Sequence, residues 1–261
     1  MRIGVLSDLH CELEPSGSRW INVFEPEHLD ERTDSALAWF AEAGVDLIVL
    51  LGDVVQFANA PDLEHVFARL AAAEVAPLAT VGGNHDLRLE DAFAERARAH
   101  GIRLLHEERF GAVVGVGIGR GTAPPQYVGR LDGRAGAGAV AVVASHFPLL
   151  SEASRVAAAG LPYAGDLVNR AELERELRAD ARPTLVLSGH IHARCSRHDG
   201  ALLQLTVGAL IEPPFDATLV ELDGTSVRRT ARRLGELAVT DPVFAPDEER
   251  WQWADGAWRA A

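Results

Sequence analysis

The sequence contains no lysine, so every basic side chain apart from histidine is an arginine. Acidic side chains outnumber basic ones by 38 to 25, and the formal net charge is −13. Proteins bind nucleic-acid backbones largely through basic contacts, so this charge argues against strong nucleic-acid binding. Cysteine is nearly absent too. Cys11 and Cys195 are too few for a disulfide scaffold and are typical of a reducing compartment.

Long apolar runs are also missing. The longest ones, such as residues 45–51, are much shorter than the ~20 residues that a membrane-spanning helix needs. The apolar run at the N-terminus ends at Ser7 and Asp8, which is too short for the core of a signal peptide. These absences predict a cytoplasmic protein that does not associate with membranes.

Strands and helices are predicted to alternate along the chain. Strands are expected at residues 2–7, 46–51, 77–81, 112–116, 140–144 and 184–187, and helices at 31–43, 62–73, 89–99 and 170–179. This alternation favours a largely parallel sheet with crossover helices. Residues 202–207 and 218–222 indicate a second sheet, to which residues 225–229 are a candidate addition. Residues 117–138 predict a loop with a hairpin, and the Trp-bearing stretch after Gly235 shows no periodicity.

Polar residues with metal-binding side chains follow five of the predicted strands. They are Asp8 and His10, Asp53, Asn84 with His85, His146, and His190 with His192. Open α/β sheets bind their ligands at the carboxyl ends of strands. Two of the pairs are spaced i, i+2, which in an extended segment directs both side chains to one side. Carboxylate, imidazole and amide ligands suit divalent transition metals, and seven candidates predict two ions that share one carboxylate.

This ordered set resembles the signature of the calcineurin-like metallophosphoesterases. That signature is Asp-x-His, Gly-Asp, Gly-Asn-His-Asp/Glu, His and Gly-His-x-His, and the chain carries it complete from Asp8 to His192. The resemblance implies an α/β fold, a four-layer α-β-β-α sandwich with two mixed sheets. It implies a catalytic domain over residues 1–235. Residues 236–261 would form a tail packed on that domain or at a subunit interface, where it could support a homo-oligomer.

The resemblance also implies a role for each motif residue. The first metal would be bound by Asp8, His10 and His192, the second by Asn84, His146 and His190, and Asp53 would bridge the two. A hydroxide held between the ions would attack phosphorus, and His85 would stabilise or protonate the leaving oxygen. The alternative for His85 is a structural histidine. Mn, Fe, Zn and Ni are all compatible with these ligands, and we favour Mn or Fe.

The residues that follow Asp53 differ from those of two subgroups of the family, which reduces the number of expected substrate classes. Gly52-Asp53 is followed by Val-Val-Gln-Phe, unlike the continuation in the protein Ser/Thr phosphatases, and Gln56 stands where purple acid phosphatases need a tyrosine. The pattern is most similar to bacterial phosphodiesterases of the class III cyclic-nucleotide type. We therefore predict hydrolysis of a small phosphodiester. The alternatives are a phosphomonoesterase or nucleotidase, and a non-catalytic scaffold. Arg88 and Arg194, which flank two motifs, are candidates for binding substrate through the planar guanidinium group; the alternative that we favour for each alone is a solvated or salt-bridged arginine.

Overall fold

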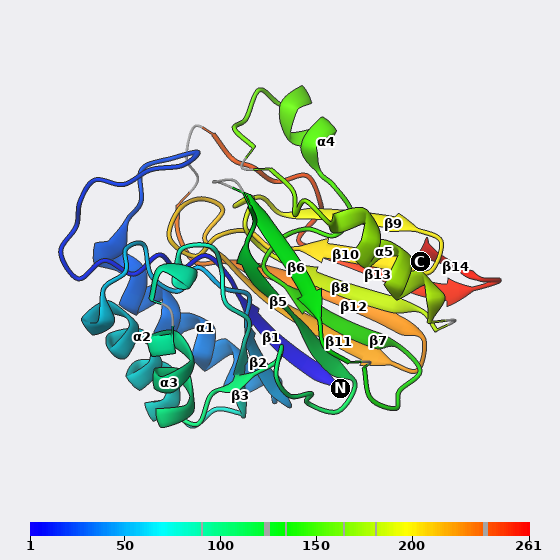
Figure 1. Cartoon of the computed structure of the whole chain (residues 1–261), viewed down its shortest axis with the longest axis horizontal. Helices are drawn as coiled ribbons and strands as arrows, with labels where there is room; N and C mark the ends of the chain where they lie inside the picture. The colour runs from blue at the N-terminus through cyan, green and yellow to red at the C-terminus, as the bar shows by residue number, and fades with distance from the viewer. Residues whose placement is uncertain (90, 123–125, 134, 164, 181, 237–239) are drawn as a thin grey trace.

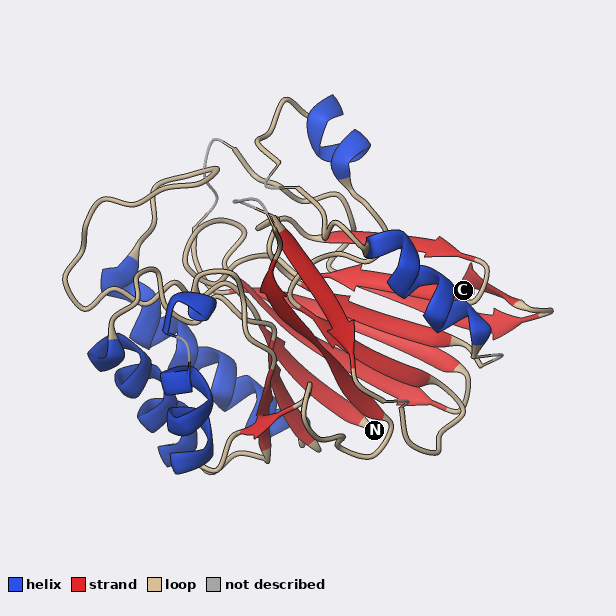
Figure 2. Ribbon diagram, in the orientation of Figure 1, coloured by secondary structure: helices blue, strands red, loops and turns tan. Residues whose placement is uncertain are grey.

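The computed structural model describes residues 1–89, 91–122, 126–133, 135–163, 165–180, 182–236 and 240–261. Two β-sheets lie face to face, and helices cover their outer faces (Figure 1 and Figure 2). The predicted four-layer sandwich with two mixed sheets is therefore confirmed. Within the described residues, no helix combines the length and the apolar character that crossing a membrane requires.

The larger sheet has eight strands in the order β14-β13-β12-β11-β1-β2-β3-β4. Their bounds are β1 Arg2–Leu6, β2 Leu47–Leu50, β3 Leu78–Thr80, β4 Arg103–Leu104, β11 Asp216–Asp223, β12 Ser226–Arg233, β13 Glu248–Ala254 and β14 Ala257–Ala260. Strands β1 to β4 are parallel. The alternating sequence pattern predicts this arrangement for β1, β2 and β3, whereas β4 was not predicted as a strand. From β11 to β14 the strands are antiparallel, and β11 joins this half of the sheet to β1.

The smaller sheet has six strands in the order β6-β5-β7-β8-β10-β9. Their bounds are β5 Val113–Arg120, β6 Tyr127–Leu131, β7 Ala141–Ser145, β8 Thr184–Ser188, β9 Cys195–Asp199 and β10 Leu202–Thr206. The predicted hairpin is the β5–β6 pair, and residues 123–125 and 134 of that stretch lie outside the described residues. The prediction that β10 and β11 share one sheet was wrong, because an alternating pattern specifies a half-buried strand but not its partner.

Helices α1, α2 and α3 cover the larger sheet, and α5 packs on the smaller one (Figure 1). The short helix α4 packs on the segment that leads from β8 into β9. The helix bounds are α1 Leu29–Ala43, α2 Ala60–Ala72, α3 Asp91–Ala99, α4 Ala153–Ala158 and α5 Arg170–Ala179, with 3-10 helices η1 Pro26–His28 and η2 Asp86–Leu89. Gly44 ends α1 in the left-handed conformation, as the sequence predicts. The predicted helix from Leu89 begins instead at Asp91, and residue 90 lies outside the described residues.

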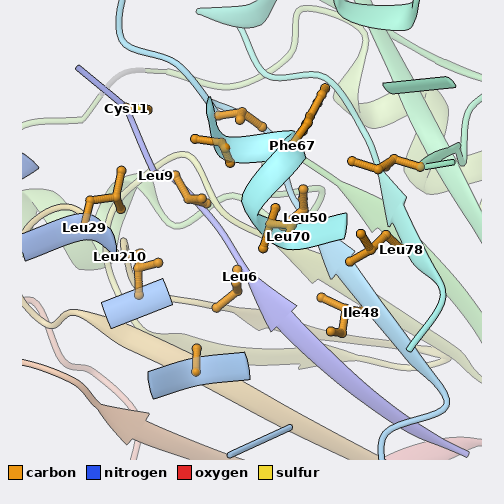
Figure 3. Close-up of a cluster of buried hydrophobic side chains, with 14 of the residues drawn as sticks. Leu6, Leu9, Cys11, Leu29, Ile48, Leu50, Phe67, Leu70, Leu78 and Leu210 are labelled. Carbon is orange, nitrogen blue, oxygen red and sulfur yellow. The ribbon is translucent and has the colours of Figure 1, made fainter. Parts of the chain in front are cut away.

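After the exposed Arg2, strand β1 is apolar because both of its faces are buried. Ile3 and Val5 lie in the core between the two sheets. Leu6 lies in the core under the helices, together with Phe67 and Leu70 of α2 (Figure 3). On that face Gly4 leaves space for the ring of Phe40 of α1, since a Cβ at position 4 would lie only 2.7 Å from that ring. The strand that carries Asp8 is thus fixed from two sides.

The C-terminal stretch, for which no regular structure was predicted, forms the β13–β14 hairpin and extends the larger sheet. Trp251 and Trp258 join the core between the sheets, and the indole N–H of Trp258 donates to the carbonyl of Ala201 over 3.0 Å. Alternation here is too short and too mixed to stand out in the sequence. Residues 237–239 lie outside the described residues. The domain boundary at 235 and a tail-mediated oligomer remain predictions.

Replacing Trp258 by alanine should destabilise the protein by about 3–5 kcal/mol, because it removes a fully buried indole and leaves a cavity. Urea denaturation of the two proteins measures the difference. The matched control is Arg259→Ala on the same strand, whose side chain is 63% exposed. It should change the free energy of unfolding by less than about 0.5 kcal/mol. Equal effects of the two changes would show that the hairpin does not contribute to the core.

Candidate metal centre

The motif residues lie in loops at the carboxyl ends of five strands that come together at one edge of the sandwich. β1 leads to Asp8 and His10, β2 to Asp53, β3 to Asn84, β7 to His146, and β8 to His190 and His192. The loops continue to pair beyond the strands. The N–H of Asp8 donates to the carbonyl of Gly52, and that of His10 to the carbonyl of Asp53. Residues from both sheets therefore face one site.

Five of the candidate ligands have a left-handed backbone. Their φ angles are 52° at Asp8, 42° at His10, 47° at Asp53, 70° at His190 and 50° at His192. The prediction that the two i, i+2 pairs lie in extended segments was therefore wrong, although the side chains of each pair still converge. A non-glycine residue in this region costs of order 1–3 kcal/mol and is typical of functional sites. No sequence pattern at these positions indicates such strain.

Two motif glycines are required because other ligand loops pack directly against them. A Cβ at position 83 would lie 2.1 Å from Oδ1 of Asp53 and 2.2 Å from its backbone nitrogen. A Cβ at position 189 would lie 1.8 Å from Oγ of Ser7 and 2.7 Å from Oδ2 of Asp8. All four distances are shorter than any contact that a Cβ atom tolerates. The glycines thus allow the loops to bring their ligands together.

Asp8, His10 and His192 form the first group of ligand atoms. Nε2 of His10 lies 3.1 Å from Nε2 of His192, which is 3.4 Å from Oδ1 of Asp8. The outer ring nitrogens are occupied, since Nδ1 of His10 bonds to Gln56 over 2.7 Å and Nδ1 of His192 to Glu212 over 2.5 Å. With Nδ1 protonated in both rings, Nε2 is the ring nitrogen of each histidine that is left to bind a metal ion.

Asn84, His146 and His190 form the second group with Asp53. Nδ1 of His146 donates to the carbonyl of Leu51, which leaves Nε2 free to face the group. That nitrogen lies 3.2 Å from Oδ2 of Asp53, 3.1 Å from Oδ1 of Asn84 and 3.2 Å from Nδ1 of His190. Four ligand atoms on four loops therefore meet at one point.

Asp53 lies between the two groups. Its Oδ2 is 3.2 Å from Nε2 of His146 in the second group and 3.7 Å from Nε2 of His10 in the first. The other oxygen, Oδ1, accepts the backbone N–H of His85 over 2.8 Å. This position is the one that a carboxylate shared by two ions would need.

Burial and mutual contact divide the four imidazoles into two charged and two neutral ones. Burial lowers the pKa of His10 and of His190 to about 3. Burial alone would lower the other two as well, but Asp53 raises the pKa of His146 to about 9. Asp8 and Glu212 raise that of His192 to about 10. The buried carboxylates thus attract positive charge into the site, and protonated imidazoles supply it.

The donor set fits divalent metal ions. Oδ1 of Asp8 is buried without a hydrogen-bond partner, a costly arrangement that a bound cation would relieve. The Nε2 atoms of His10 and His192 lie 3.1 Å apart, while the Nδ1 atoms are bonded to Gln56 and Glu212. Two ring nitrogens at this distance need a shared proton or a cation between them. Imidazole nitrogens with carboxylate and amide oxygens are ligands for first-row transition metals.

His85 lies beside the two groups and not within the second one. Its Nδ1 bonds to the backbone carbonyl of Gln56 over 2.7 Å, and its ring packs edge-on against His10 at 4.8 Å between centroids. One ring nitrogen also lies within 4.8 Å of ligand atoms of His10 and Asp53. The ring borders the cavity over the metal-binding groups, where it can reach a bound substrate.

Neither arginine predicted to bind substrate is among the residues that line this cavity. Arg194 is buried and pairs with Asp216 and Asp247, and its backbone N–H donates to the carbonyl of Pro242. Arg194 therefore links the segment that follows His192 to the C-terminal residues Pro242 and Asp247. Arg88 lies exposed on η2, which follows the Asn84-His85 loop. These positions do not favour direct contact with a substrate in the cavity.

The cavity has a volume of about 270 Å³ and a wall that the sequence did not indicate. Besides ligands and His85, it is lined by Arg19, Trp20, Phe24, Gln56 and Tyr127. Sequence reasoning also missed Glu212 and the role of Asp86. The Asp86 carboxylate accepts three backbone N–H groups, from Gly83, Val54 and Val55, and so joins two ligand loops. Only its place in the Gly-Asn-His-Asp motif could have drawn attention to it.

Comparison with known proteins agrees with this geometry. Residues 1–194, most of the chain, match the family described as calcineurin-like phosphoesterase. The chain belongs to this family, and it is a metallophosphoesterase with candidate residues for two divalent metal ions. No curated protein matches the sequence.

Two solved structures have a similar fold. A dimetal phosphatase from Danio rerio is 15% identical with a TM-score of 0.63, covering 89% of this chain and 96% of its own. The protein TT1561 from Thermus thermophilus is 19% identical with a TM-score of 0.50, covering 84% of this chain and 93% of its own. At these identities the likeness concerns the fold alone.

Asp53→Asn should abolish binding of the metal pair. The change removes the negative charge that both groups of ligands share. Loss of a residue that only hydrogen-bonds a ligand lowers metal affinity by about 10–100-fold, and loss of this ligand charge should lower it further. Elemental analysis after dialysis against Mn²⁺ measures the ions per chain. The control, Asp223→Asn, neutralises an exposed carboxylate and should leave metal content unchanged. A full metal complement in Asp53→Asn would show that the shared position is misassigned.

Proposed function

We propose that this protein hydrolyses a small phosphodiester with a two-metal centre. One observation carries the proposal: both groups of ligand atoms, the ring of His85 and an aromatic wall border one cavity of about 270 Å³. Asp8, His10 and His192 would hold one ion and Asn84, His146 and His190 the other, with Asp53 shared. The similarity to a dimetal phosphatase from Danio rerio supports such a centre.

Two bound ions would activate water and neutralise negative charge on the phosphoryl oxygens. The chain itself arranges the groups around that chemistry. Gln56 and Glu212 keep protons on the outer nitrogens of His10 and His192, so their inner nitrogens stay available as ligands. Manganese or iron is our preferred occupant, because imidazole and carboxylate ligands suit both. A cytoplasmic location, with its reducing conditions, is supported by the two free cysteines.

We assign to His85 the transfer of a proton to the leaving oxygen. Its Nδ1–H donates to the carbonyl of Gln56, so Nε2 is the ring nitrogen that remains to donate to or accept from a substrate. The backbone N–H of His85 donates to Asp53, which fixes the residue relative to the ligands. A positioned group of this kind contributes typically 10²–10⁴-fold to a rate.

The wall of the cavity supports a small substrate that carries an organic group. Trp20, Phe24 and Tyr127 offer apolar surface next to the ligands. Arg19 favours the second candidate, a phosphomonoesterase, because its guanidinium at the cavity could bind the additional negative charge of a monoester.

Turnover of two model substrates by the Mn²⁺-loaded protein tests this choice. We expect a higher kcat/KM with bis(p-nitrophenyl) phosphate than with p-nitrophenyl phosphate. In the variant Arg19→Ala, the KM for the diester should change by less than about threefold, since a diester has no second charge to lose. A preference for the monoester, together with a large rise of its KM in Arg19→Ala, would establish the second candidate instead.

His85→Ala should keep its metal ions and lose turnover, because the ring contributes a proton and not a ligand. The loss should be about 10²–10⁴-fold for an alkyl leaving group and much smaller for p-nitrophenolate, which leaves without protonation. Metal content by elemental analysis and rates with both leaving groups measure the effect. His28→Ala, at an exposed position on η1, is the control. Equal losses for both leaving groups would contradict the assignment.

A further inference from the structure

The segment of residues 18–24, hereafter the wall loop, has little regular structure of its own. A single bridge between Arg19 and Val23 and the hydrogen bond from the N–H of Phe24 to the carbonyl of Ser18 close it into a turn. Arg19, Trp20 and Phe24 of this loop line the cavity. Its position must therefore be set by contacts with other parts of the chain.

Gln56 provides the first of these contacts and at the same time holds a candidate ligand. Its side-chain oxygen accepts from Nδ1 of His10 over 2.7 Å, and its side-chain nitrogen donates to Oγ of Ser18 over 3.2 Å. The two ends of one amide thus join an imidazole of the first group to the beginning of the wall loop.

Glu212 connects the other imidazole of the first group, that of His192, to the wall loop. This fully buried carboxylate accepts from Nδ1 of His192 over 2.5 Å. It also accepts the backbone N–H of Ile21, over 3.3 Å, and that of Asn22. Two amides at the tip of the wall loop therefore depend on the carboxylate that orients His192. Glu212 lies beyond residue 194, where the family match ends.

Ring contacts complete the connection. The ring of Phe24 lies 5.1 Å from that of His10 and stacks on that of His192 at 5.8 Å between centroids. The wall loop thus touches both imidazoles of the first group, directly through Phe24 and through Gln56 and Glu212. A rotation of His10 would break its hydrogen bond to Gln56, and a rotation of His192 its hydrogen bond to Glu212, the two side chains that hold the loop.

We propose that Gln56 and Glu212 are positioning residues that couple ion binding at His10 and His192 to the order of the wall loop. An ion on Nε2 fixes each ring and makes its Nδ1–H a stronger donor, which in turn fixes Gln56 and Glu212. By linkage, loss of the loop's anchors must weaken ion binding by the same factor. Loading of the first site would therefore organise the substrate side of the cavity, a consequence that rests on the proposed function.

Hydrogen exchange of the wall loop, followed by mass spectrometry while Mn²⁺ is added to the metal-free protein, tests the coupling. In the wild type we expect exchange over residues 18–24 to slow by at least about fivefold on loading, the lower end of typical coupling between sites. In Glu212→Gln an NH₂ group replaces one acceptor oxygen, so the amide cannot accept from all three donors at once. We expect Mn²⁺ affinity, measured by calorimetry, to fall about 10–100-fold. Protection of the wall loop at saturating Mn²⁺ should also be lost.

The matched control is Glu152→Gln, which makes the same change at another fully buried carboxylate whose ion pair is with Arg155. It should retain the wild-type response of the wall loop. Gln56→Leu is a second variant, which keeps the size of the side chain but removes both hydrogen bonds. It should also lower Mn²⁺ affinity and reduce protection of the wall loop, here through His10. If Glu212→Gln does not fold, the wild-type titration and Gln56→Leu still decide.

Two results would overturn the coupling. One is wild-type protein that binds Mn²⁺ without any change of exchange over residues 18–24. The other is Glu212→Gln and Gln56→Leu with the wild-type response. Neither result depends on turnover, so a protein that shows the response but hydrolyses no phosphoester would refute the proposed function and leave the coupling intact. For an active enzyme we further expect Glu212→Gln at saturating Mn²⁺ to raise KM more than it lowers kcat.

Discussion

Two buried carboxylates, those of Asp8 and Asp53, determine what the rest of the site has to provide. A carboxylate withdrawn from water requires compensating positive charge and hydrogen bonds. Protons on His146 and His192 meet this requirement in the metal-free arrangement, since Asp53 raises the pKa of the first and Asp8 that of the second. Divalent ions meet it more fully, because each brings two charges and direct bonds. Metal binding should therefore release protons, as it does wherever ligands must be deprotonated.

The backbone strain at the ligands shows how the two sheets contribute. Left-handed conformations at five ligand positions would each relax if the loops were free. They persist because β1, β2 and β8 are interior strands of their sheets and are buried on both faces where these loops begin, so the loops start at fixed points. Close contacts at Gly83 and Gly189 and the three hydrogen bonds to Asp86 then fix the loops against one another. Burial in the two cores thus offsets strain that is localised at the metal centre.

The candidate ligands could be selected from the sequence because they stand in short motifs that follow one another in a specific order, and the structure brings these residues together. The sequence could not predict Gln56 and Glu212 as their partners, since amides and carboxylates are common and nothing near Glu212 marks its contact with His192. The strand at Asp216–Asp223 was assigned to the wrong sheet for the same reason: its pattern defines a buried face, whereas its pairing with β1 depends on contacts far along the chain. The β13–β14 hairpin was missed because its alternation is short.

Substrate selection in this fold depends on residues outside the motifs, because the same ligands can serve different phosphoesters. In this chain the cavity residues outside the motifs include Arg19, Trp20 and Phe24 of the wall loop and Tyr127 of β6. The wall loop is held by the groups that orient two ligands, so its sequence is not free to vary independently of the metal centre. Tyr127 is connected to the second group, since its ring packs on Phe147, whose ring lies against those of His146 and His190. A substitution on either side of the cavity should therefore also affect candidate ligands, those of the first group from the wall loop and those of the second group from β6.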